Sequence, residues 1–105
     1  MEKFAAIVLS AGTGSRMKSD IPKQYMDLNG RPVIYYSLKA FEDSDVDSIV
    51  LVTGRDDIEY CRKEIVEKYG FTKVKAIIAG GAERYDSVFG GLKAVKDCDY
   101  VMIHD

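Results

Sequence analysis

The alternation of apolar runs and amphipathic stretches predicts strands and helices in turn along the chain. Apolar runs that are uninterrupted and rich in β-branched residues indicate strands buried on both faces. Four such runs occur, over residues 4–9, 48–53, 74–79 and 100–104. Strands that alternate with helices predict a mostly parallel sheet with right-handed crossovers, which is an α/β fold.

The first helical pattern follows a predicted turn. Asn29-Gly30 is a strong tight-turn dipeptide, and Pro32 suits the first turn of a helix, where its missing N–H costs nothing. Apolar residues then recur at helical spacing to about Glu42, at positions Ile34, Leu38 and Phe41. We therefore expect a helix between the first two strands.

Two further helices are predicted between the remaining strands. For the second, Asp56 and Glu59 form a capping box at the start, and Gly70 is placed to end the helix. Its expected apolar face consists of Ile58, Cys61, Ile65, Val66 and Tyr69. The third helix is expected from about Arg84 to Val95, with inward positions at Val88, Leu92 and Val95. Gly90-Gly91 inside it costs roughly 1 kcal/mol per glycine relative to alanine, so we interpret the pair as close packing of helix on sheet.

Composition narrows the class of protein. With 105 residues, 47% hydrophobic and 30% charged, the chain has the composition of one small globular domain with a modest core. A net charge of −2 gives no electrostatic case for nucleic acid or an anionic membrane as a partner. No apolar run approaches membrane length, and Cys61 and Cys98 are isolated, as in a reduced protein. We therefore expect a cytoplasmic enzyme.

A glycine-containing loop follows the first predicted strand. Gly12 and Gly14 stand among small residues, so backbone N–H groups can approach an anion closely. Arg16 and Lys23 can then neutralise phosphate oxygens. The spacing fits neither a P-loop nor a dinucleotide-binding fingerprint. From the loop alone, a glycine turn with two solvated cations is the alternative to a nucleotide site.

Three candidate ligand-binding segments follow predicted strands. They are the loop with Gly12, the Gly80-Gly81 turn and Asp105, which come after the first, third and fourth strands. Because the carboxyl ends of parallel strands meet at one edge of a sheet, these segments are expected to share the ligand-binding edge. A backbone role at the Gly-Gly turn and a hydroxyl role for Ser87 would suit recognition of a base edge. Taken alone, Ser87 is also typical of a helix-end hydroxyl, and Asp105 of a solvated carboxylate.

Three separated blocks in this order resemble a known superfamily. They are Leu9-x-Ala11-Gly12-x-Gly14-x-Arg16-Met17 with Pro22-Lys23-Gln24-Tyr25, the stretch of residues 80–88, and His104-Asp105. The pattern resembles the nucleotidyltransferases that make nucleoside-diphospho sugars and alcohols, and within them the 2-C-methyl-D-erythritol 4-phosphate cytidylyltransferase family. The resemblance implies a Rossmann-like three-layer sandwich of the nucleotide-diphospho-sugar transferase type. Since that family's chains are longer, it also implies that residues 1–105 are the amino-terminal, nucleotide-binding part of a single domain, truncated after the fourth strand.

The resemblance also implies an activity and its residues. The family joins CTP to a small alcohol phosphate with the help of Mg²⁺, and its full-length members are homodimers. Arg16 and Lys23 would stabilise the charge that develops on the phosphates, and Asp105 would bind the metal ion. The other implied nucleotide-binding positions are Ser10, Ala11, Gly12, Thr13, Gly14, Gly81, Ala82 and Ser87. Ser10 and Ala82 stand at positions that vary within the family and act through the backbone.

Two alternatives remain open at this point. One keeps the chemistry but uses ribitol 5-phosphate as the acceptor, although Arg84-x-x-Ser87-Val88 looks more like the methylerythritol phosphate enzymes. The other is a nucleotide-binding module without activity of its own, and we expect the 105-residue chain alone to be inactive. His104 is the one histidine in the sequence, and a core or strand-end role is expected for it rather than metal ligation.

Overall fold

The computed structural model describes residues 3–10, 26–81, 83–95 and 98–104. Four parallel strands form the central sheet in the order β5-β4-β1-β6. Their bounds are β1 (Phe4–Leu9), β4 (Ser48–Thr53), β5 (Val74–Ala79) and β6 (Tyr100–His104). All four predicted strands are confirmed. The chain moves outward from β1 through β4 to β5 and then returns to the other side of β1, so the strand order reverses at β1.

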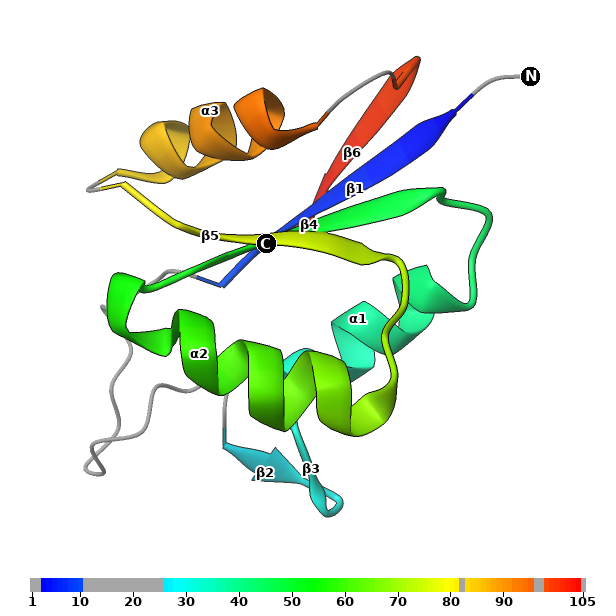
Figure 1. Ribbon diagram of the computed structural model, residues 1–105, viewed down its shortest axis with the longest axis vertical. Coiled ribbons are helices and arrows are strands. Elements are labelled where there is room, and N and C mark those ends of the chain that lie inside the picture. The colour runs from blue at the N-terminus through cyan, green and yellow to red at the C-terminus, as the bar shows by residue number, and fades with distance from the viewer. Residues whose placement is uncertain (1–2, 11–25, 82, 96–97, 105) are drawn as a thin grey trace.

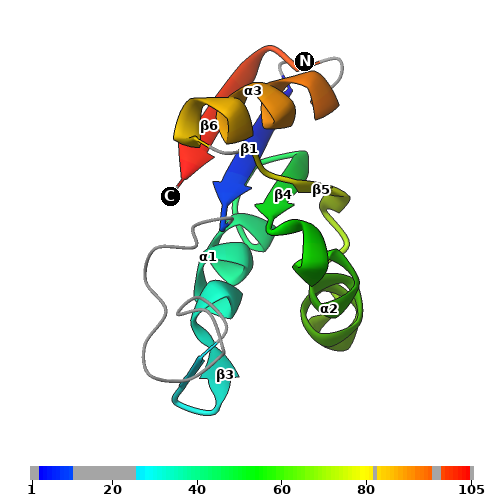
Figure 2. The ribbon, with the colours of Figure 1, turned by 90° about the vertical axis from the view of Figure 1, so that its left-hand side faces the viewer.

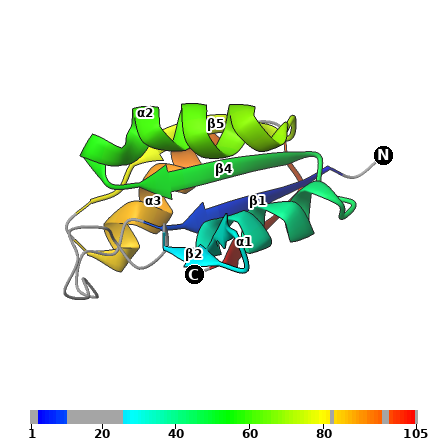
Figure 3. The same cartoon turned by 90° about the horizontal axis from the view of Figure 1, so that it is seen from below.

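The helices cover both faces of this sheet. The helical segments are α1 (Val33–Glu42), α2 (Ile58–Cys61) and α3 (Arg84–Ala94). A 3₁₀ turn (Arg55–Asp57) precedes α2, and a π-helical segment (Arg62–Glu67) continues it. α1 and α2 lie on one face of the sheet and α3 on the other (Figure 1), which confirms the predicted three-layer α/β sandwich. Figure 3 shows α2 along β4 and β5 and α1 along β1.

Alternate side chains of the strands supply two apolar layers. Ala6 and Val8 of β1 pack with buried residues of α1, such as Leu38, and of the π-helical segment after α2, such as Ile65. Ile7, between them, faces the α3 side together with Val50 and Val52 of β4, and these three side chains are almost fully buried. Because strand side chains point to opposite faces in turn, a sheet covered on both faces needs the continuous apolar runs seen in the sequence.

A short hairpin leads into α1. Its strands are β2 (Asp27–Leu28) and β3 (Arg31–Pro32). Asn29 and Gly30 between them have φ of 55° and 84°, the left-handed values that a tight two-residue hairpin turn requires. The Tyr36 hydroxyl of α1 donates a hydrogen bond to the Leu28 carbonyl, which holds the hairpin against the helix. The predicted Asn29-Gly30 turn is confirmed.

The α2 region differs from prediction at its start and agrees at its end. The predicted Asp56–Glu59 capping box is wrong, because neither the 3₁₀ turn nor α2 has a side-chain cap hydrogen bond. The 3₁₀ turn already begins at Arg55, so Asp56 lies inside the first helical turn and not at the cap position. A capping box does occur at α3, where Glu83 and Asp86 exchange hydrogen bonds with each other's backbone N–H. Gly70, with φ of 68°, ends the second helix as predicted.

Glu42 fastens the end of α1 to the segment that enters β5. Its carboxylate accepts hydrogen bonds from the backbone N–H of Thr72, the Thr72 hydroxyl and the backbone N–H of Lys73. Burial acts to raise the pKa of Glu42, but these hydrogen bonds and the nearby Lys73 charge outweigh it and lower the pKa below the ordinary glutamate value. The stabilisation therefore holds at neutral pH and is lost as the pH falls through that lowered pKa.

α3 packs on the sheet through small residues. Ser87 and Gly91 are its buried positions, whereas Leu92 is 44% exposed and Val88 only partly buried. The predicted inward role of Leu92 is therefore wrong. The helix approaches so closely that a Cβ on Gly91 would lie 2.7 Å from Cγ2 of Ile7, and this turns the larger side chains to the flank. For Gly91, the close packing predicted from Gly90-Gly91 is confirmed.

The adjacent glycines give a matched test of this packing. Gly91→Ala should lower the free energy of unfolding, because overpacking costs typically about 1–3 kcal/mol and the gain in helix propensity returns only about 1 kcal/mol. Gly90→Ala should be neutral or stabilising, since its Cβ would meet only Cδ1 of Ile78 at 3.5 Å. Urea denaturation of both variants in the full-length protein measures the difference. Equal stabilities would contradict the close contact between Gly91 and Ile7.

Candidate active site

Three chain segments leave the sheet at the carboxyl ends of their strands. Ser10 follows β1, Thr53 ends β4, and Gly80 follows β5. The Ser10 N–H donates to the Val52 carbonyl at 2.7 Å, and the Gly80 N–H donates to the Thr53 carbonyl at 2.8 Å. These bonds extend the ladder past the strands, so the start of the first loop and the Gly80-Gly81 turn lie at one edge, as predicted.

Ser10 donates two hydrogen bonds to the sheet. Its side chain is buried, and its hydroxyl donates to the same Val52 carbonyl at 3.0 Å that accepts its N–H. The Ser10 N–H therefore serves the sheet ladder.

The turn after β5 is built around Gly81 and Ser87. The Gly81 N–H donates to Oγ of Ser87 at 3.2 Å, and the Ser87 side chain is only 6% exposed. A Cβ on Gly81 would lie 2.2 Å from Cβ of Asp86, so the turn accepts no side chain there. Asp86 is itself held by the backbone N–H of Glu83. The turn, the cap and the first turn of α3 thus form one fixed unit.

The Ser87 hydroxyl is a hydrogen-bond acceptor in this unit. Its oxygen accepts the Gly81 N–H through a lone pair, which leaves the O–H group as a donor. A buried donor at the carboxyl edge of a sheet can distinguish ligands by whether they offer an acceptor. This is the chemistry expected of a residue that recognises a nucleobase edge.

Of the residues predicted for the site, only part falls within the described structure. Ser10, Gly81 and Ser87 lie at the carboxyl edge, and Gly81 and Ser87 are in direct contact. The other predicted positions lie outside the described residues: Ala11, Gly12, Thr13, Gly14, Arg16, Lys23, Ala82 and Asp105. Their roles stay predictions.

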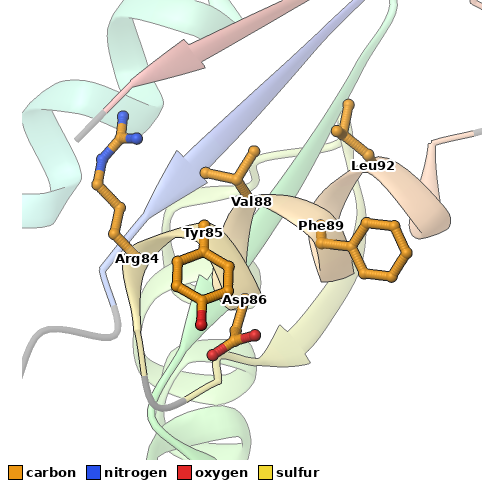
Figure 4. Close-up of a pocket in the computed structure, with 6 residues that line it drawn as sticks. All are labelled: Arg84, Tyr85, Asp86, Val88, Phe89 and Leu92. Atoms are coloured by element: carbon orange, nitrogen blue, oxygen red, sulfur yellow. The ribbon is translucent and has the colours of Figure 1, made fainter.

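Arg84 is a cation at this edge that was not among the predicted site residues. It is the first residue of α3, and in Figure 2 the carboxyl end of β6 and the start of α3 are on the same side of the view. Figure 4 shows the Arg84 side chain extending toward that end of β6. It borders an open hollow of about 470 Å³ along the outer side of α3. The sequence signal was its place three residues after Gly81 and at a helix start, where a side chain can reach the edge.

Comparison with known proteins identifies the family of this chain. The family model described as 2-C-methyl-D-erythritol 4-phosphate cytidylyltransferase matches residues 4–105. The chain belongs to this family. Curated family members are 57% identical over 105 residues in Lachnoclostridium phytofermentans and 59% identical over 101 residues in Lachnospira eligens. These matches cover 100% and 95% of the chain but only 45% and 44% of the relatives, so the chain spans less than half of their length.

A solved structure agrees with the family assignment. The crystal structure of 4-diphosphocytidyl-2C-methyl-D-erythritol synthase from Anaerococcus prevotii superimposes with a TM-score of 0.78 at 33% sequence identity. The match covers 99% of this chain and 43% of that one. The sheet order, the three layers and the Gly81–Ser87 unit are thus features of a chain that belongs to the cytidylyltransferase family, as its motifs predicted.

Proposed function

We propose that the protein to which this chain belongs joins CTP to 2-C-methyl-D-erythritol 4-phosphate and releases pyrophosphate. Family membership over residues 4–105 carries the proposal. The Gly81–Ser87 unit supports it, because it provides a buried donor for a nucleobase at the carboxyl edge of the sheet. The reaction belongs to the non-mevalonate route to isoprenoid precursors.

The chemistry determines which residues matter. A phosphate oxygen of the acceptor attacks the α-phosphorus of CTP, a new P–O bond forms, and the bond to the β-phosphate breaks in line. The nucleophile is already ionised, so no general base is required. The barrier comes from bringing two anions together and from charge on the equatorial oxygens. Arg16 and Lys23 would stabilise that charge, the arginine through its planar fork and the lysine as a point charge.

Mg²⁺ is part of the proposal. Asp105 would hold it, and the ion would neutralise phosphate charge when bound. Within residues 3–10, 26–81, 83–95 and 98–104 no cluster of three or more His, Cys, Asp or Glu could hold a metal ion. An Mg²⁺ bound by one carboxylate, waters and substrate phosphates needs no such cluster.

In the described part of the chain no helix is long and apolar enough to cross a membrane. The homodimer and the cytoplasmic location stay predictions from the sequence.

Turnover assays with the full-length protein test the proposal. Pyrophosphate release should require CTP together with methylerythritol phosphate. Activity with ribitol 5-phosphate but not with methylerythritol phosphate would establish ribitol 5-phosphate as the acceptor. No turnover with either acceptor, together with equal binding of CTP, ATP and NADPH in the presence and absence of Mg²⁺, would remove the case for a cytidylyltransferase.

Ser87 gives a sharper test of nucleotide recognition. In the full-length protein, Ser87→Ala should lower kcat/KM for CTP by about 10- to 100-fold, because a buried hydrogen-bonding group that loses its partner costs about 1–3 kcal/mol. The comparison of CTP with UTP measures whether selectivity for cytosine falls as well. Ser44→Ala is the matched control, since it also removes a serine oxygen that accepts a backbone N–H, that of Val46. A Ser87→Ala enzyme with unchanged nucleotide selectivity would assign Ser87 to turn structure alone.

A further inference from the structure

The carboxyl end of β6 contacts both β1 and α1. Among the described strands it pairs only with β1, and the last pair in the register is Val8 with His104. Met102 and Ile103, directly before His104, are exposed on opposite sides of the strand. The backbone of β1 therefore holds one side of this strand end.

A side-chain tie from α1 reaches the same strand end. Oγ of Ser37 lies 3.1 Å from Nε2 of His104, a hydrogen bond across 67 positions of sequence. The His104 ring also meets the edge of the Phe41 ring, with centroids 5.7 Å apart and planes at 75°. Ser37 and Phe41 are one helical turn apart, so both contacts come from one face of α1.

α1 is a firm support for this tie. Its Ile34 and Leu38 are buried in the core, and Glu42 binds its end to the segment before β5. A hydrogen bond and a ring contact from such a helix limit the positions open to the imidazole. Either ring tautomer can make the bond, because the serine hydroxyl can donate to Nε2 or accept from it.

The position of this tie in the chain gives it a role. His104 directly precedes Asp105, and consecutive Cα atoms are about 3.8 Å apart, so whatever fixes His104 limits the positions open to the next residue. Functional carboxylates need placement within about 0.5 Å. We infer that Ser37 and His104 are a positioning pair that sets the carboxyl end of β6 for the carboxylate that follows. The inference rests on the proposed function, in which Asp105 is that carboxylate.

The pair is tested in the full-length enzyme with Ser37→Ala and Ser37→Thr. Ser37→Ala removes the hydroxyl and should lower kcat about 10- to 100-fold, as for other small misplacements of catalytic groups, with KM for CTP changed less than about threefold. Ser37→Thr keeps the hydroxyl and should recover most of kcat. Folding should persist, since alanine is the better helix former. Tyr36→Phe is the control, because it removes the neighbouring hydroxyl that bonds to the hairpin and should leave kcat unchanged.

A second readout is independent of turnover. In ¹⁵N spectra of the imidazole nitrogens, the signals of His104 are those that disappear in His104→Gln. Ser37→Ala should shift the Nε2 signal, and Ser37→Thr should return it. Wild-type kcat in Ser37→Ala, or a loss that Ser37→Thr does not recover while the histidine spectrum is unchanged, would overturn the inference. Absence of turnover in the wild-type enzyme would overturn the proposed function instead, and the spectra would still report whether the hydrogen bond exists.

Discussion

Replacing Arg16 or Lys23 with alanine in the full-length protein is expected to lower kcat by about 10²–10³, the scale for losing one donor that stabilises transition-state charge. The physical reason is that both reactants are anions, so the barrier is largely electrostatic. The added charge on the equatorial oxygens exists only in the transition state. KM for CTP should therefore change much less than kcat. Steady-state kinetics with varied CTP and saturating acceptor measure both constants.

Two exposed cations provide matched controls for these variants. Arg62 pairs with Glu59, and Lys39 pairs with Asp43 at the carboxyl end of α1. Arg62→Ala and Lys39→Ala remove the same charges and should leave kcat unchanged, since exposed ion pairs contribute little to stability. If Arg16→Ala or Lys23→Ala kept kcat and only raised KM, the residue would bind the nucleotide equally well in the ground state and in the transition state.

The sheet could be predicted from sequence because its strands carry their own signal. Residues 48–53 and 74–79 are short, continuous and rich in Val and Ile, and such runs fit a strand covered on both faces. The Asn29-Gly30 turn and the end of the second helix at Gly70 could be predicted for a different local reason. Each needs a positive φ that few residues adopt, and the structure shows that φ at Asn29, Gly30 and Gly70.

The errors arose where tertiary packing decides. Leu92 has helical spacing, but Gly91 lets α3 approach Ile7 so closely that Ser87 and Gly91 face the sheet instead. The capping box at Asp56 failed because a 3₁₀ turn begins one residue earlier. Both outcomes depend on how the helix sits on its neighbours, and spacing along the sequence does not contain that information.

The candidate site was likewise predictable only where the signal is local in sequence. The sequence placed Gly81 and Ser87 at one edge, because Gly81 directly follows the end of a predicted strand and Ser87 lies near the start of the next predicted helix. The hydrogen bond between them depends on the turn geometry that Asp86 and Glu83 fix. Ser37 and His104 could not be paired in advance, because their contact depends on how β6 pairs with β1 and how α1 crosses them. The motif identified the chemistry, while the fold identifies the residues that hold it in place.

The 105-residue chain on its own is expected to self-associate or to be only marginally stable, with a low melting temperature. It should release no pyrophosphate from CTP and methylerythritol phosphate. β6 lies at the edge of the sheet, and its Tyr100, Met102 and Ile103 are 51%, 43% and 43% exposed. An edge strand offers unpaired backbone donors and acceptors, and when it is also apolar it promotes pairing with another chain. Turnover should be absent because the chain spans only 45% of the first relative's length.

Sedimentation velocity, thermal unfolding and a pyrophosphate assay measure these three outcomes. A charge on the edge strand should block pairing, so Met102→Lys should shift the chain toward the monomer. Leu28→Lys is the matched control, because Leu28 is exposed to a similar degree but lies in the hairpin away from β6, and it should leave the association unchanged. Association that Met102→Lys does not reduce would place the contact elsewhere, for example on the outer side of α3, where Tyr85 and Phe89 are exposed. A stable monomer that turns over both substrates would show instead that the edge of β6 is a native surface and that residues 1–105 contain a complete active site.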